Sequence, residues 1–114
     1  MKVMQRKPTH PGEILLEEFA KPYGLTQKVL SKKLGTTIRT ISELYNEKRG
    51  VSPEMALKLS RLFGTTPDLW TNLQKKYDLY RAYQKRKKEI EKVVPLKKHP
   101  PKSIQNKRGT SIKN

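Results

Sequence analysis

The chain has 114 residues, no cysteine and a formal net charge of +16, and hydrophobic residues make up 33% of it. One small domain with appended segments is therefore expected, because so low an apolar share cannot place every residue around a core. The lack of cysteine excludes disulfides and thiolate zinc sites, and the positive charge predicts a polyanionic partner. Residues 79–114 hold 12 lysines and arginines against 2 acidic residues, whereas residues 1–78 hold 14 against 8, so the folded part is only moderately basic.

A first helix is predicted from Pro11 to about Lys21, after a loose basic arm over residues 1–9. Proline suits the first position of a helix, where its missing N–H has no partner to lose, and His10 then stands at the N-cap. Pro22 ends the helix, because a proline disfavours the helical conformation of the residue before it. The apolar face of this helix consists of Leu15, Leu16, Phe19 and Ala20.

Two short amphipathic helices follow, joined by a glycine turn. Thr26 is expected to cap the second helix and Thr37 the third, since a threonine hydroxyl accepts a backbone N–H of the first turn. Gly35 stands where a left-handed residue is needed to end the second helix. The buried faces are predicted to be Val29, Leu30 and Leu34, then Ile41, Leu44 and Tyr45. The pair has the outline of a helix-turn-helix, a unit that reads DNA.

Two further helices are predicted by the start signals Ser52-Pro53-Glu54 and Thr66-Pro67-Asp68. Gly64 ends the fourth helix, and the fifth is expected to reach about Val93. One stripe of the fifth helix holds Leu69, Trp70, Leu73, Tyr77 and Tyr80. We expect the first three to cover the core, and Tyr77 and Tyr80 to lie at a dimer or partner interface.

The fold class is therefore all-α, with five helices and no strand pattern. The expected divisions are a basic N-terminal arm (1–9), a helix-turn-helix domain (10–83) and a basic C-terminal extension (84–114) that is disordered from about residue 95. Neither a signal peptide nor a membrane span is expected, because no segment approaches about 18 consecutive apolar residues. A cytoplasmic protein is predicted.

The third helix carries the predicted chemistry. At about 100° per residue, its apolar residues lie on one side and a polar face lies on the other. The predicted base-reading residues are Thr37, Ile38, Arg39, Ser42 and Glu43. Arg39 is the strongest candidate, because an arginine can donate two hydrogen bonds to guanine, worth about 1–3 kcal/mol of base discrimination. The predicted contacts to the DNA backbone are Gln27, Thr40, Lys48 and Arg49.

Two alternatives remain for this face. Arg39 and Glu43 are four residues apart, so they also fit an ordinary surface ion pair worth a few tenths of a kcal/mol. Ile38 either touches thymine methyl groups or packs inward.

Enzyme chemistry finds little support in the sequence. The two histidines, His10 and His99, are far apart, and the adjacent Glu17 and Glu18 point about 100° apart on a helix. No phosphate-binding glycine loop and no metal-ligand spacing are present. We expect no catalytic residues, no metal and no cofactor.

The segment from Leu25 to Arg49 resembles the helix-turn-helix of the lambda-repressor-like (XRE) superfamily. The matching positions are Gln27, Leu34-Gly35, Ile41, Leu44 and Asn46. Three further motifs, HPGEIL at 10–15, NEKRGVS at 46–52 and FGTTPDLW at 63–70, are similar to those of the HigA/VapI antitoxins, so the resemblance spans about residues 8–80.

The resemblance implies a homodimer that binds double-stranded DNA at an inverted-repeat operator, represses its own operon and neutralises a RelE/HigB-like, mRNA-cleaving toxin. It places Gln27, Thr37, Ile38, Arg39, Thr40 and Glu43 at the groove-facing positions. The family usually has glycine where Glu47 stands, so Asn46 is expected to take the left-handed conformation that ends the third helix.

Two points stay open at this level. The alternative function is a stand-alone helix-turn-helix regulator, or an architectural nucleic-acid binder, without a toxin. The lysine-rich extension either adds non-specific affinity for DNA or serves only as a solubilising tail, and its charge opposes binding to a basic toxin.

Overall fold

The structure, a computed structural model, describes residues 6–96. Within that range all regular structure is helical: α1 (Pro11–Ile14), the π-helical η1 (Leu15–Ala20), α2 (Gln27–Leu34), α3 (Ile38–Tyr45), α4 (Pro53–Phe63) and α5 (Pro67–Glu91). Because η1 continues α1 without a break, residues 6–96 contain the five helices that the sequence predicts. The first half of the predicted arm and nearly all of the predicted tail lie outside the described residues.

The helix starts follow the predicted capping pattern. The hydroxyls of Thr26, Thr37, Ser52 and Thr66 each accept a backbone N–H three residues ahead, at 3.0–3.3 Å. His10 caps α1 through a ring nitrogen: its Nδ1 accepts the N–H of Gly12 at 2.9 Å. Since these bonds are local in sequence, the pattern of capping residues is enough to predict them.

The end of α3 differs from the prediction. Asn46 is not left-handed, with φ −94°; the residue after it, Glu47, has φ 60°. Asn46 instead donates from Nδ2 to the Ser42 carbonyl at 2.8 Å and so closes the last turn of α3. Tertiary contacts of the Glu47 carboxylate, described below, favour the strained conformation of that residue.

A single core joins the helices. Trp70, at the start of α5, is fully buried, and its ring lies 5.2 Å from Phe19 of η1. Its Nε1 donates to Thr65 Oγ1 at 2.8 Å, so the buried indole has no unsatisfied donor. The predicted covering residues Leu69 and Leu73 pack against this core. Val29 does not: it is 41% exposed, so its predicted place in the buried stripe of α2 is wrong.

At Gly12 the backbone of α1 lies directly against the backbone of α3. A Cβ built on Gly12 would lie 1.8 Å from the carbonyl oxygen of Leu44, far inside van der Waals contact. Only glycine therefore allows α1 to lie this close to the helix that carries the predicted DNA-reading face.

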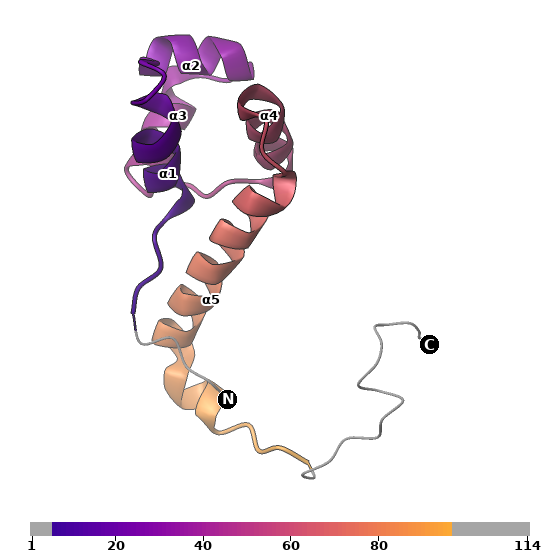
Figure 1. Cartoon of the computed structure of the whole chain (residues 1–114). Coiled ribbons are helices and arrows are strands. Elements are labelled where there is room, and N and C mark those ends of the chain that lie inside the picture. Colours follow the sequence, from indigo (N-terminus) through magenta and orange to yellow (C-terminus); the bar gives the residue numbers. More distant parts are fainter. Residues whose placement is uncertain (1–5, 97–114) are drawn as a thin grey trace.

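The fifth helix extends well beyond the helical cluster, and the N-terminal segment runs alongside it (Figure 1). Its backbone departs from helical geometry at Arg86, where φ is −122° and ψ is 29°. None of the helices in residues 6–96 is both long and apolar enough to cross a bilayer.

The position of Tyr77 also differs from the prediction, as those of Asn46 and Val29 do. It is only 5% exposed, because its ring lies edge-on to His10 with the ring centroids 4.6 Å apart. Residues of the same chain bury Tyr77, so its ring is not available for contact with a partner subunit. Tyr80, one turn further along, is only partly buried.

Candidate nucleic-acid interface

The helix-turn-helix consists of α2, the turn at residues 35–37 and α3. Leu30 and Leu34 of α2 and Ile41 and Leu44 of α3 are all buried. Gly35 makes the turn possible with φ 67°, a conformation that glycine adopts without strain. The apolar side of α3 is thus held against the core, and the opposite side lies on the surface.

The predicted base-reading face is on that exposed side. Ile38 is 47% exposed, so the alternative in which it packs inward is wrong and the alternative in which it faces DNA remains. The Arg39 side chain is 85% exposed. Both residues belong to the first turn of α3, the part of a recognition helix that reaches base edges in the major groove.

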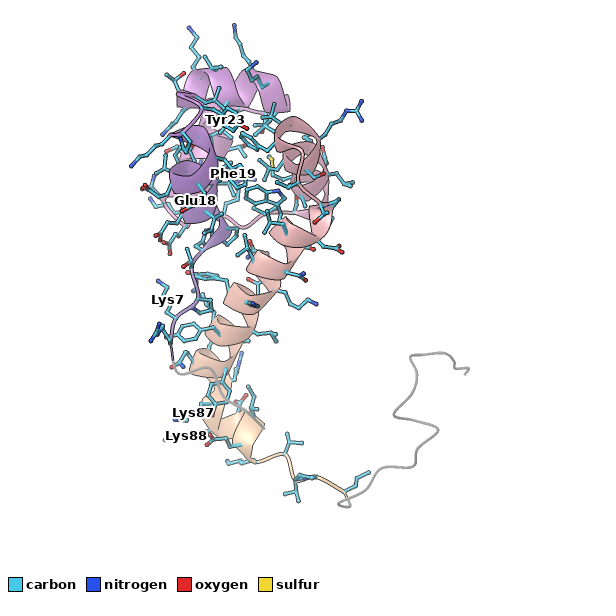
Figure 2. All side chains as sticks on the ribbon, in the orientation of Figure 1. Lys7, Glu18, Phe19, Tyr23, Lys87 and Lys88 are labelled. Atoms are coloured by element: carbon cyan, nitrogen blue, oxygen red, sulfur yellow. The ribbon has the colours of Figure 1, made fainter. Side chains whose placement is uncertain are left out.

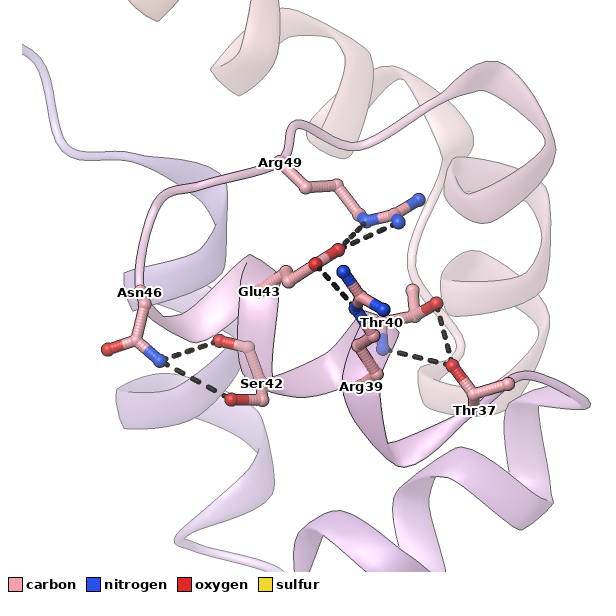
Figure 3. Close-up of polar contacts among 7 residues, drawn as sticks. All are labelled: Thr37, Arg39, Thr40, Ser42, Glu43, Asn46 and Arg49. Carbon is pink, nitrogen blue, oxygen red and sulfur yellow. Dashed lines mark hydrogen bonds and ion pairs between the residues drawn. The ribbon is translucent and has the colours of Figure 1, made fainter.

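Glu43 joins two arginines across this face. Its Oε2 accepts from Arg39 Nε at 3.0 Å, and its Oε1 accepts from Arg49 Nε at 2.9 Å and Nη2 at 2.8 Å (Figure 3). The hydrogen bonds from Arg49 and then from Arg39 lower the pKa of Glu43 below its ordinary value. The carboxylate is therefore ionised at neutral pH and holds two guanidinium groups of like charge side by side.

The pairing with Glu43 leaves Arg39 able to read a base. Only Nε of Arg39 is bonded to Glu43, and its two terminal amino groups make no hydrogen bond within residues 6–96. A guanine presents O6 and N7 to such a pair of donors. The i, i+4 ion pair and base reading, which stand as alternatives at the level of sequence, are thus geometrically compatible.

Three of the other predicted polar residues already have local partners. Thr37 Oγ1 caps α3 and accepts the N–H of Thr40, and the hydroxyls of Thr37 and Thr40 are 3.0 Å apart (Figure 3). Ser42 Oγ lies 3.4 Å from Asn46 Nδ2. These contacts order the two ends of α3, so the side chains most available for DNA are those of Ile38 and Arg39.

The residues predicted to contact the DNA backbone lie on α2, on α3 and in the loop after α3. Gln27 is the first residue of α2 and is partly exposed, Thr40 is also partly exposed, and Lys48 lies exposed in the loop after α3. Arg49 is near Lys48 but is turned back onto Glu43. The contacts of these four residues with phosphates stay a prediction.

A network that no sequence motif predicts supports the loop after α3. The Tyr77 hydroxyl of α5 donates to Glu47 Oε1 at 3.3 Å, and Lys7 Nζ lies 3.5 Å from the same oxygen. Burial lowers the pKa of His10, which packs on Tyr77, so its neutral ring remains an acceptor for the N–H of Gly12. These residues are up to 70 positions apart. No short-range pattern connects them.

Comparison with known proteins identifies the family. Residues 16–70 match the family model described as helix-turn-helix. Virulence-associated protein I of Dichelobacter nodosus is 44% identical over 87 residues, which cover 76% of this chain and 80% of that protein. Antitoxin HigA-1 of Vibrio cholerae is 35% identical over 96 residues, covering 84% of this chain and 90% of that protein. The chain belongs to the HigA/VapI family.

A solved HigA structure has the same fold. The structure of Pseudomonas aeruginosa antitoxin HigA with higBA promoter aligns with a TM-score of 0.75 at 38% identity, and the alignment covers 78% of this chain and 98% of that one. HigA proteins and their helix-turn-helix relatives are DNA-binding regulators and antitoxins. The prediction that this chain is not an enzyme is confirmed by that membership.

Proposed function

We propose that this HigA-family chain binds its own operator through the first turn of α3 and represses its operon, and that it neutralises a RelE/HigB-like toxin. The observation that carries the DNA-reading part is the geometry of Arg39, which is 85% exposed and is held by Glu43 through Nε alone. The solved structure of Pseudomonas aeruginosa HigA with the higBA promoter supports the choice of DNA as the ligand.

In the proposed mechanism, α3 enters the major groove and Arg39 donates from its terminal amino groups to a guanine. Ile38 lies beside it and offers apolar contact to a thymine methyl group. Lys48 neutralises a phosphate and positions the domain without reading sequence. No covalent bond is made or broken, so repression follows from occupancy of the operator alone.

The test compares Arg39→Ala with Lys48→Ala on DNA from upstream of the gene and on unrelated duplexes. Arg39→Ala should lower the preference for the operator by about 5-fold to 150-fold, the equivalent of about 1–3 kcal/mol. Lys48→Ala should weaken binding to every duplex about equally. Identical effects of the two substitutions on both DNAs would contradict base reading by Arg39.

A homodimer is proposed as the binding unit, with its two α3 helices about 34 Å apart and an operator that is an inverted repeat. An apolar hollow of about 510 Å³ between the start of α4 and α5 supports this, since Leu79 at its edge is 55% exposed. Tyr80 is retained as a predicted interface residue. A solution mass equal to one chain at micromolar concentration would contradict the dimer.

The toxin is proposed from the family alone. Co-expression with the adjacent reading frame should give a complex that co-purifies, and growth arrest caused by that frame should be relieved by this chain. If no neighbouring frame encodes a small toxin-like protein, the chain is instead a stand-alone regulator of the same fold.

A further inference from the structure

The face of α5 beyond Tyr77 carries positive charge that operator reading by α3 does not use. Lys7 Nζ and the Arg81 guanidinium lie 5.7 and 5.8 Å from the centre of the Tyr77 ring. Lys7, Arg81 and Lys85 also line one open hollow of about 820 Å³ that includes no acidic side chain. Three cations from two distant segments thus share one surface.

The surface continues along the helix. At 100° per residue, Arg81 and Lys85 follow Tyr77 at intervals of four, so the stripe that is buried at Tyr77 becomes basic beyond it. Lys88 falls on the same stripe, and Figure 2 shows it on the side of α5 along which the N-terminal segment with Lys7 runs. We name Lys7, Arg81, Lys85 and Lys88 the basic ridge.

The acidic residues near the ridge do not neutralise it. Glu89 lies 3.4 Å from Arg86, which is outside the ridge, and Glu91 accepts a hydrogen bond from the Tyr83 hydroxyl at 2.6 Å. Glu47 is paired with Lys7, and Glu47 and Asp78 line a separate hollow together with Arg81. Within residues 6–96, Lys85 and Lys88 have no acidic partner within 4 Å. Like charges gathered without counter-charges repel one another, and a polyanion relieves that repulsion while releasing its own bound counterions.

We propose that the basic ridge binds the phosphate backbone of duplex DNA without regard to sequence, as a second DNA-binding surface separate from α3. The charge complementarity favours DNA because a polyphosphate backbone matches a row of lysines without a defined register. This proposal goes beyond operator reading and does not depend on it, because the ridge and Arg39 lie on different segments and are tested by different DNAs.

The experiment measures the affinity of the full chain for a short non-operator duplex across a salt series. Lys85→Gln/Lys88→Gln removes two ridge charges, and Arg61→Gln/Lys76→Gln removes two exposed charges, one from α4 and one from another face of α5. The change in net charge is equal, so general electrostatic attraction falls equally in both. Circular dichroism melts check that both variants remain folded.

The ridge variant should flatten the slope of log affinity against log salt by about 1.8, because each phosphate that is no longer neutralised reduces that slope by about 0.9. At 0.1 M salt its affinity should fall by up to about 60-fold, and the control should weaken much less. Equal reductions in the two variants, or an unchanged slope in the ridge variant, would overturn the proposal. So would poly-glutamate binding to the ridge as tightly as duplex DNA at the same salt concentration.

Discussion

Substitution of Gly12 by alanine gives the sharpest test of how α1 packs on α3. Gly12 lies in the first turn of α1, and a Cβ there would be 1.8 Å from Leu44 O and 2.6 Å from Leu44 C. Both atoms are backbone atoms of α3, so no side-chain rotation can relieve the overlap. Helix propensity alone predicts the opposite outcome, because alanine is favoured over glycine within a helix by about 1 kcal/mol.

The magnitude follows from the difference between these two effects. Overpacking of a well-packed core costs about 1–3 kcal/mol, and the upper end applies where backbone must move. After the gain from propensity of about 1 kcal/mol, a net loss of about 2 kcal/mol remains. For a domain of this size that corresponds to a fall in Tm of about 8–16 °C.

The assay is thermal and urea unfolding followed by circular dichroism, with Gly64→Ala as the matched control. Gly64 has φ 73° and no atom within 4 Å of a built Cβ, so its substitution adds backbone strain of about 1–2 kcal/mol without overlap. Gly12→Ala should also weaken operator binding, because α3 must shift, whereas Gly64→Ala should not. A Tm of Gly12→Ala equal to or higher than that of the unsubstituted chain would refute the packing argument.

Three further results are expected. Burial in the folded state favours the neutral form of His10, so the stability that this form contributes should be complete above pH 6.5 and should be lost as the pH falls through the lowered pKa of His10. Urea unfolding at several pH values measures this loss. The variant His10→Asn should not show it, because asparagine also caps a helix but does not titrate. Tyr77→Phe keeps the ring but removes the bond to Glu47, and should lower the free energy of unfolding by about 1 kcal/mol, whereas no change in Tm would show that the bond does not support the loop. Glu43→Gln removes the negative charge that holds Arg39 and Arg49, so affinity for non-operator duplexes should rise and the preference for the operator should fall in the same titration. A rise in the preference for the operator would contradict the role of Glu43 in positioning Arg39.

Much of the helix pattern is readable from sequence because it depends on neighbours. The hydroxyl of Thr37 needs only the N–H of Thr40 three residues ahead. Gly35 and Gly64 end their helices with positive φ for the same local reason. The outward direction of Arg39 also follows, since the apolar residues of α3 determine which side is buried.

The errors of sequence interpretation lie where distant segments meet. Asn46 tolerates the left-handed conformation, yet Glu47 adopts it, because its carboxylate is bonded by Tyr77 and Lys7. Tyr77 continues an apolar stripe and so looks available to a partner, but the ring of His10 lies against it. No periodicity within one helix contains that information.

By itself the sequence determines five helices, their caps, a helix-turn-helix and the exposed face from Ile38 to Glu43, because backbone capping and amphipathic periodicity act over three or four residues. Only the tertiary structure decides how Glu43 divides its two oxygens between Arg39 and Arg49, and that Lys7 joins Arg81 on one surface. Those arrangements depend on distances between segments that packing brings together, and packing is a property of the whole core.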